Sequence, residues 1–364
     1  MDPRIEDHAE VIVDHSVGVR PDDEVIVSGH PVAEDLVAAI VRLCGKRGAN
    51  VTTTLRTSQV SAAYKRAIDV DDISLSEVSL AMVEAADVYI GISADTNTHE
   101  SGDIDPDKNA AMAQANKPIQ ETYLNKRWVG TQYPAPGNAQ DAEMSTATYE
   151  SFVWGAINKD WAAVREHQQQ LVDLLNPAEE VRIVSGDTTD IRMSIAGNPA
   201  QNDYAERNLP GGEVFTAPVP NSVNGEVVFD KPLMAQGREI QDVRLRFEGG
   251  EVIEHAAAKN EEVLAAVLDT DAGARRLGEL GIGMNRDIDQ FSYNMLFDEK
   301  MGDTVHMALG RAYEDTVGED NKQNESAVHM DMIVDMSDQS RIEVDGEVIQ
   351  RNGRFQFEAG FEAN

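Results

Sequence analysis

The first half of the chain alternates short β-branched runs with longer segments in which apolar residues recur every three or four positions. The short runs predict strands at residues 24–29, 51–57 and 87–94. The longer segments predict helices at residues 5–17, 31–48, 61–68, 80–86, 108–115, 146–157 and 161–175. Because strands alternate with helices of this length, we expect βαβ units and a parallel sheet.

The pattern changes after the segment NPAEE at residues 176–180, where proline and charge follow a long helix. Beyond it, short alternating runs dominate, and the pairs GG and DG between such runs are hairpin signals. We therefore predict an α/β chain with a boundary here. Residues 1–178 would form an N-terminal domain with a mostly parallel sheet and flanking helices, and residues 179–364 a C-terminal α+β domain with an antiparallel sheet.

Charge is the unusual feature of the composition, with 65 acidic residues against 31 basic ones and a net charge of −34. Such a field repels nucleic acid and anionic membranes, so we expect neither as a partner. The acids are interspersed through regular apolar periodicity, a pattern that resembles proteins of extreme halophiles. It indicates an environment and says nothing about the chemistry.

Several sequence features favour the cytoplasm. The apolar runs are far shorter than the roughly 20 residues of a membrane span. The acidic N-terminus lacks the basic and apolar regions of a signal peptide, and the single cysteine, Cys44, cannot form an internal disulfide.

A G-x-G-x-x-G fingerprint does not follow the first strand, so a dinucleotide site is unsupported.

Two predicted strands in the second half carry histidines on the face opposite their apolar residues. In AVHMDMIVDM, residues 327–336, alternation turns His329 and Asp331 to the same side. In TVHMALG, residues 304–310, His306 points away from the apolar face. If the two strands share a sheet, an imidazole from one joins an imidazole and a carboxylate from the other, a set that binds a divalent ion.

Four further residues are candidates for the same chemistry. Glu213 follows a Pro-Gly-Gly turn, where the backbone can approach a ligand closely. Glu279 begins the small-residue segment ELGIGMN, and Glu299 lies in FDEK just before the His306 strand. Tyr313, in GRAYED, is either a core aromatic or a donor facing a cleft. Taken singly, each carboxylate is better explained as a solvated one, because the chain carries so many, and the histidines could be polar positions of a half-solvated sheet.

Four segments in order and spacing make the pattern specific: NLPGGEVFTAPVPNSVNGEVVFD, ELGIGMN, LFDEKMGDTVHMALGRAY and SAVHMD. With them, the chain resembles the thermophilic aminopeptidase family of metallopeptidases, the aminopeptidase T type. The segment NKRWVGTQYPAPGNAQDAEMSTATYESFVWGAI is also similar to the family, so the likeness covers nearly the whole chain. The loop from Tyr313 to His329 is shorter and more acidic than in several relatives.

The resemblance implies a site. The family's metal ligands match Glu213, Glu279, Glu299, His306, His329 and Asp331, and its active-site tyrosine matches Tyr313. It implies two divalent ions per chain, about 3.5 to 4 Å apart, for which Zn²⁺, Co²⁺ or Mn²⁺ suits mixed carboxylate and imidazole ligands. Glu279 or Glu213 would bridge the ions, and Tyr313 would donate to the developing oxyanion. The implied activity is removal of N-terminal residues from short peptides by a homodimer.

Two other functions stay open. His306, His329 and Asp331 also form the facial set of mononuclear Fe(II) oxygenases, and a ring-cleaving dioxygenase of the dihydroxypyridine type is known on a similar scaffold. The extra carboxylates Glu213 and Glu279 favour two hydrolytic ions over one iron. A peptide-binding or inactive scaffold is disfavoured, because every family ligand position is filled.

Overall fold

The computed structural model describes residues 2–235 and 238–362 and divides into two compact units. The first consists of residues 1–159 with 205–211, and the second of residues 160–204 with 212–364. The predicted domain boundary at 178/179 stays a prediction. The units change over earlier, so the helix α8 (Trp161–Leu175) goes with the second unit. None of the described helices is both long and apolar enough to cross a membrane.

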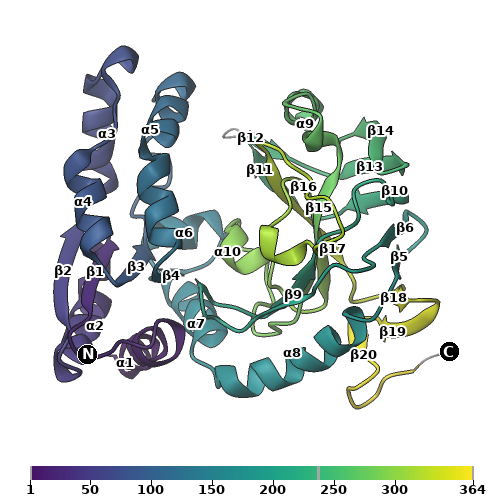
Figure 1. Cartoon of the computed structure of the whole chain (residues 1–364), viewed down its shortest axis with the longest axis horizontal. Coiled ribbons are helices and arrows are strands. Elements are labelled where there is room, and N and C mark those ends of the chain that lie inside the picture. The colour runs from purple at the N-terminus through teal and green to yellow at the C-terminus, as the bar shows by residue number, and fades with distance from the viewer. Residues whose placement is uncertain (1, 236–237, 363–364) are drawn as a thin grey trace. The chain divides into compact units, whose positions relative to one another are not determined.

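The first unit is built on a parallel sheet in the order β2-β1-β3-β4, with the short β8 added beside β4 (Figure 1). Its strands are β1 (Glu24–Gly29), β2 (Asn50–Leu55), β3 (Val88–Ser93), β4 (Arg127–Gln132) and β8 (Asn208–Leu209). Its helices are α1 (Pro3–Glu10), α2 (Glu34–Lys46), α3 (Ser58–Ala67), α4 (Glu77–Ala85), α5 (Pro106–Leu124), α6 (Pro136–Asp141) and α7 (Thr146–Ile157).

The predicted βαβ pattern and parallel sheet are therefore confirmed in this unit. Helices α4 and α5 cover one face of the sheet, where Ile26 packs with Val83 and Ala86. One segment departs from the prediction. Helix α5 continues through Pro118 to Leu124 and β4 follows it closely, whereas the sequence predicts a helix only over residues 108–115 and no strand directly after it. Proline lowers helix propensity locally, and tertiary packing overrides it.

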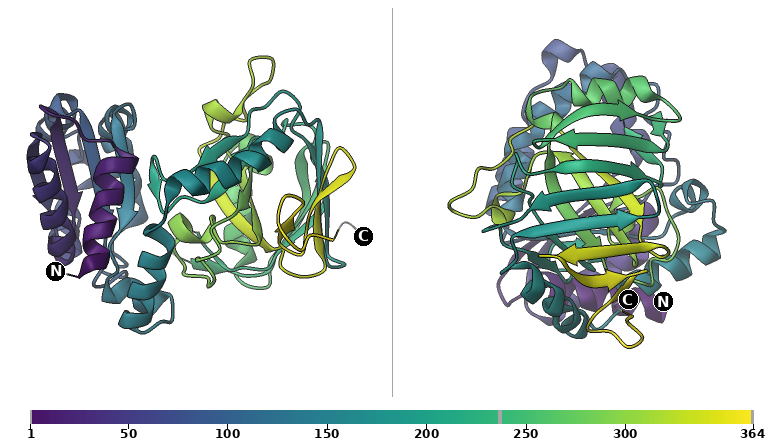
Figure 2. Two further views of the ribbon diagram at one scale, coloured as in Figure 1. Left: turned by 90° about the horizontal axis from the view of Figure 1, so that it is seen from below. Right: turned by 90° about the vertical axis from the view of Figure 1, so that its right-hand side faces the viewer.

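The second unit contains two antiparallel sheets. The larger has the order β14-β13-β10-β6-β5-β18-β19-β20, and its strands lie one after another in the right-hand view of Figure 2. They are β5 (Glu180–Ser185), β6 (Thr189–Ser194), β10 (Asn224–Phe229), β13 (Val243–Glu248), β14 (Glu251–Ala256), β18 (Ser340–Val344), β19 (Glu347–Arg351) and β20 (Arg354–Phe355). Glycines 250 and 346 take φ of 84° and 85° in the hairpins that GG and DG predict.

The smaller sheet has the order β17-β16-β15-β9-β7 and carries the residues of interest. Its strands are β7 (Gln201–Asp203), β9 (Glu213–Thr216), β15 (Leu277–Gly283), β16 (Thr304–Gly310) and β17 (His329–Asp335). A two-stranded ribbon, β11 (Leu233–Ala235) and β12 (Arg238–Ile240), and the helices α9 (Glu261–Leu268) and α10 (Met295–Asp298) complete the unit. The predicted fold class, parallel sheet first and antiparallel α+β part second, is confirmed.

One apolar core lies between these two sheets. Val181 and Ile183 of β5 and Leu245 of β13 share it with Leu280 of β15 and Met307 of β16. Only one face of the smaller sheet is needed for this core. The alternation along each strand therefore turns the other set of side chains out of the core, as predicted for residues 304–310 and 327–336.

Candidate metal centre

Strand register brings five of the six predicted ligands onto one face of the smaller sheet. His306 of β16 pairs with Gly281 of β15, and Glu213 of β9 pairs with Gly283. On the other side of β16, Ala308 pairs with Asp331 and Gly310 pairs with His329. Paired residues of an antiparallel sheet point to the same side, so carboxylates and imidazoles from four strands converge opposite the core.

Gly281 makes room for one of these imidazoles. A Cβ atom built on Gly281 would lie 2.0 Å from both Cε1 and Nε2 of His306. The ring of His306 therefore lies directly against the backbone of the neighbouring strand, in space that only glycine leaves free. The sequence gave no functional reason for the small residues of ELGIGMN. In the structure, one of them, Gly281, provides the space for the imidazole of His306.

The structure also explains why a glycine, Gly212, precedes Glu213. Its φ is 117°, and a Cβ atom there would lie 2.5 Å from the Cβ atom of Asn285. The close approach that a glycine permits here is to another part of the chain. It fixes where β9, and so Glu213, begins.

The tightest group consists of Glu213, Glu279 and His306, which are all buried. Nε2 of His306 lies 3.3 Å from Oε2 of Glu213 and 3.3 Å from Oε1 of Glu279. One ligand atom from each of the three residues lies within 4.8 Å of the other two. Two carboxylates and one imidazole at these separations are a suitable partial shell for a divalent ion.

A second group shares Glu279. Nε2 of His329 lies 3.6 Å from Oε2 of Glu279 and 3.5 Å from Oδ2 of Asp331. Nδ1 of His329 lies 2.8 Å from the carbonyl oxygen of Arg311, which can only accept, so Nδ1 carries the proton. Nε2 is then left with a lone pair facing the carboxylates, the arrangement of a metal-binding histidine.

The buried oxygens of this cluster fit a missing cation. Oε2 of Glu213, Oε2 of Glu279 and Oδ1 of Asp331 are buried without a hydrogen-bond partner among the described residues. Buried carboxylate oxygens without partners are costly, and in native proteins they mark a place for an ion or another unseen group. The donor set present therefore fits the metal that the sequence pattern predicts.

The electrostatics of the cluster agree with this. Burial would lower the pKa of His306, but Glu279, Glu213 and Asp331 outweigh it and raise the pKa to about 10. Burial raises the pKa of Glu213 to about 8 against the opposing charge of Lys300. Burial and the repulsion of Glu299 raise the pKa of Asp331 to about 6. These shifts indicate that the buried carboxylates favour positive charge beside them, which a divalent ion would supply.

Tyr313 lies beside this cluster, on the segment that leaves β16. Its ring centroid lies 4.9 Å from that of His329 and 6.2 Å from that of Phe215, whose ring it meets edge-on. The residue is 46% exposed. Partial burial and the nearby carboxylates raise the pKa of Tyr313, so the phenol keeps its proton at neutral pH. At this exposure Tyr313 is not a core aromatic, and its role as a donor at the site stays a prediction.

Glu299 follows helix α10, contacts Lys300 and also interacts electrostatically with both His306 and His329. Oε1 of Glu299 contacts Nζ of Lys300, and the same Nζ lies 3.1 Å from Oε1 of Glu213 and 3.7 Å from Oδ2 of Asp203. Lys300 and Asp203 are not among the residues predicted for the site. The only signal for Lys300 in the sequence is its place in FDEK, and a lysine is ordinarily a surface residue.

Gln168 is another buried polar residue that the sequence does not single out. Its Nε2 donates to the carbonyl oxygens of Glu213 and Asp203 and to Oδ1 of Asn202. The side chain thus ties helix α8 to the backbone of β7 and β9. It holds the start of β9 in place, and with it Glu213.

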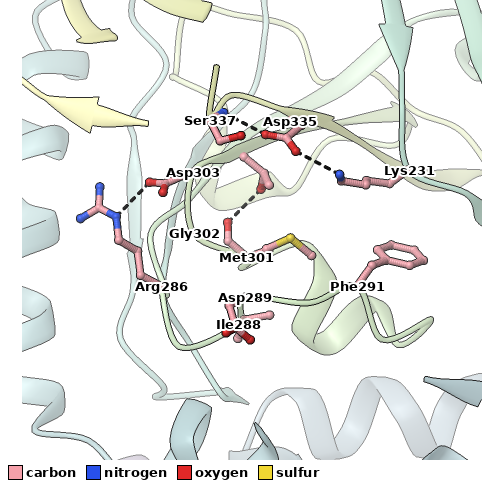
Figure 3. Close-up of a pocket in the computed structure, with 11 residues that line it drawn as sticks. Lys231, Arg286, Ile288, Asp289, Phe291, Met301, Gly302, Asp303, Asp335 and Ser337 are labelled. Atoms are coloured by element: carbon pink, nitrogen blue, oxygen red, sulfur yellow. Dashed lines mark hydrogen bonds and ion pairs between the residues drawn. The ribbon is translucent and has the colours of Figure 1, made fainter. Parts of the chain in front are cut away.

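A pocket of about 270 Å³ lies on the same unit but contains none of the predicted ligands (Figure 3). Four of its charged groups pair within it, Lys231 with Asp335 at 3.1 Å and Arg286 with Asp303 at 2.9 Å. Met301 and Thr304 line it, close in sequence to Lys300 and His306. The candidate chemistry lies in the carboxylate and imidazole cluster, outside this pocket.

The family model of the thermophilic metalloproteases, M29, matches residues 1–355 of the chain. The chain belongs to this family, as predicted, and its enzyme class, a metal-dependent aminopeptidase, follows from that membership.

Among individual proteins, the chain is 28% identical to Aminopeptidase 2 of Geobacillus stearothermophilus, over 97% of this chain and 98% of that protein. It is 39% identical to Aminopeptidase T of Thermus aquaticus, over 38% of this chain and 36% of that protein.

Two solved structures share the fold. The structure of wild-type AmpT from Thermus thermophilus matches 97% of this chain and 99% of its own, with a TM-score of 0.87 and 24% identity. That of 2,5-dihydroxypyridine dioxygenase from Pseudomonas putida KT2440 matches 98% and 97%, with a TM-score of 0.61 and 15% identity. At these identities the likeness concerns the fold alone, and family membership decides between hydrolase and dioxygenase.

Proposed function

We propose that this chain removes N-terminal residues from short peptides at a centre of two divalent ions. The observation that carries the proposal is the position of Glu279 between two histidines. Its Oε1 lies 3.3 Å from Nε2 of His306, and its Oε2 lies 3.6 Å from Nε2 of His329. One carboxylate that turns a different oxygen to each imidazole is suited to bridge two ions.

Two half-sites follow from this division. Glu213, Glu279 and His306 would hold one ion, and Glu279, His329 and Asp331 would hold the other. Mixed carboxylate and imidazole ligands favour Zn²⁺, Co²⁺ or Mn²⁺ over Mg²⁺ or Ca²⁺, which prefer oxygen alone. When bound, the ions would polarise the scissile carbonyl and supply a nucleophilic water at neutral pH.

The protein's own residues would orient and stabilise the reacting groups. Tyr313, with its proton retained, would donate a hydrogen bond to the oxygen of the scissile carbonyl as negative charge develops there. Its ring is held against His329 and Phe215, so the hydroxyl needs little reorganisation. Glu279 would keep both half-sites in register and, as a buried carboxylate, could accept a proton from the attacking water.

The setting of the reaction is part of the proposal. From the family resemblance we expect a homodimer. The acidic composition and the single cysteine favour a reducing cytoplasm of high salt. Gel filtration with light scattering in molar KCl would measure the oligomeric state.

The test joins elemental analysis with a chromogenic aminoacyl substrate, assayed in high salt with and without a chelator. We expect two equivalents of divalent metal per chain and activity that chelation abolishes. Glu279→Gln should lower kcat/KM by about 10³-fold or more, because the variant loses a shared ligand. One iron per chain with oxygen uptake on a dihydroxypyridine, or full activity in Glu279→Gln, would overturn the proposal.

A further inference from the structure

Lys300 is a fully buried lysine at the edge of the carboxylate cluster, with 0% of its surface exposed. Burying an ammonium group is costly unless anions surround it closely. Three do so: Oε1 of Glu299, Oε1 of Glu213 at 3.1 Å and Oδ2 of Asp203 at 3.7 Å. The lysine is therefore part of the buried electrostatics of the site.

The two oxygens of Glu213 have different neighbours, because the ammonium group of Lys300 contacts only one of them. Oε1 lies 3.1 Å from Nζ of Lys300, whereas Oε2 lies 3.3 Å from Nε2 of His306. Oε2 is buried and has no hydrogen-bond partner among the residues described. Glu213 is thus held at one oxygen and presents the other to the place where the ion is expected.

Charge balance gives a second, independent reason for a cation here. Five carboxylates gather at the site, those of Asp203, Glu213, Glu279, Glu299 and Asp331. Two divalent ions and one ammonium group would neutralise five carboxylates, whereas two ions alone would leave one negative charge buried. Isolated buried charge is unfavourable, so Lys300 completes the balance that the ions begin.

We propose that Lys300 is a positioning residue of the metal centre: it fixes Oε1 of Glu213 so that only Oε2 serves the ion shared with His306. The inference rests on the proposed metal-dependent function and deepens it. Glu299 then acts as the counterion of Lys300 and lies outside the ligand shell. The centre would consist of five ligand residues, Glu213, Glu279, His306, His329 and Asp331.

The test replaces the native metal with Co²⁺, whose visible absorption changes with the number and geometry of its ligands. The full-length protein is titrated with Co²⁺, and the affinity and spectrum are recorded. The principal variant is Glu299→Gln with Lys300→Met, which removes one charge of each sign and keeps the local balance. A change in Co²⁺ binding then reports the loss of orientation and not a change of net charge.

We expect the double variant to bind Co²⁺ about 10- to 100-fold more weakly, with an altered spectrum, as for other residues that orient metal ligands. Glu299→Gln alone should leave the spectrum at its wild-type form, because Lys300 still holds Glu213. Lys300→Arg keeps a charged donor and should restore most of the affinity. The matched control is Lys231→Met with Asp335→Asn, an ion pair of the same unit outside the proposed ligands, which should leave Co²⁺ binding unchanged.

Circular dichroism and the thermal midpoint verify folding, and Lys300→Met alone carries the same test if the double variant does not fold. A wild-type spectrum and affinity in the folded Lys300→Met variants would overturn the role of Lys300 and leave the metal centre standing. A spectrum altered as much by Glu299→Gln alone would overturn it as well, in favour of Glu299 as a ligand. A wild-type protein that takes up no Co²⁺ would overturn the metal centre, and with it any role of Lys300 there.

Discussion

Two histidines with no exposed surface, one in each unit, show opposite chemistry. His8 of the first unit faces the hydroxyl of Thr131, with 2.9 Å between Nε2 and Oγ1, and burial lowers its pKa to about 3. His306 of the second unit is equally buried, yet its pKa is raised to about 10. The same side chain at the same depth has its pKa lowered in one place and raised in the other.

The difference lies in the neighbours. Desolvation acts on both rings and favours the neutral form. Around His306, however, Glu279 and Glu213 each place an oxygen 3.3 Å from Nε2, and their charge outweighs the cost of burial. Burial therefore makes a core histidine, whereas burial among carboxylates makes a place for a proton or a metal ion. This contrast separates a structural position from a candidate functional one.

We expect the largest effect from a substitution that displaces the ring of His306. Gly281→Ala would put a methyl group where the imidazole lies, 2.0 Å from its Nε2. The ring has to move, and a ligand displaced in this way should lower metal affinity and kcat/KM by about 100-fold or more. Isothermal titration with Zn²⁺ or Co²⁺ and the peptidase assay measure the two effects.

The matched control is Gly155→Ala, in helix α7 of the first unit, where an added Cβ meets no atom within 4 Å. There, alanine should raise the thermal midpoint slightly, because it restricts the unfolded chain and favours the helix. Equal metal affinity in Gly281→Ala and in wild-type protein would show that His306 does not serve the ion.

Removing the metal should destabilise the unit that contains His306, because the ion binds there, and should not destabilise the surroundings of His8. At a metal concentration about 100 times Kd, binding at one site stabilises the folded state by about 2.7 kcal/mol. Chelation should therefore lower the thermal midpoint by about 5 to 10 °C, measured by scanning calorimetry in high salt. In Glu279→Gln the chelator should have a much smaller effect, and an unchanged midpoint in wild-type protein would contradict a metal bound to the fold.

The smallest effect concerns His8 and the pH dependence of stability. Its pKa of about 3 in the folded chain lies below the value of about 6.5 expected in the unfolded chain. Between these values the unfolded chain binds more protons, so the contribution of His8 is present above about pH 6.5 and is lost as the pH falls toward 3. The slope is at most about 1.4 kcal/mol per pH unit.

His8→Asn should remove this part of the slope, at a cost of about 1 to 3 kcal/mol near pH 7 from the lost packing. Urea unfolding at pH 7 and pH 5 measures both quantities. His99→Asn, at an exposed position of the same unit, should leave the difference between the two pH values as in wild-type protein. If His8→Asn does the same, burial of His8 does not link folding to pH.

Much of the site could be predicted from strand alternation. In residues 304–310 and 327–336 the period of two separates a core face from a polar face, and the structure keeps this division with Met307, Met332 and Val334 in the core. The sequence therefore specifies that His306, His329 and Asp331 leave the core together. The same local pattern could not show that Glu213 and Glu279 lie on the neighbouring strands. The family resemblance indicated these two residues as ligands but not their place in the sheet.

Other features depend on contacts between residues far apart in the chain. Lys300 resembles any surface lysine in sequence, and its burial follows from the meeting of Asp203, Glu213 and Glu299 around it. The continuation of α5 through Pro118 likewise depends on packing against the sheet, because Ile119 and Tyr123 contact the cluster around Ile26.

The sequence by itself determined the class of each half, the strands that carry the histidines, and the face to which those histidines turn. These are consequences of periodicity, which acts over a few residues and is written along the chain. Tertiary structure decided which carboxylate oxygen meets which imidazole, where Gly281 leaves room for a ring, and that a lysine is buried among acids. Those properties depend on register and burial, and both are set only when distant strands pair and exclude water.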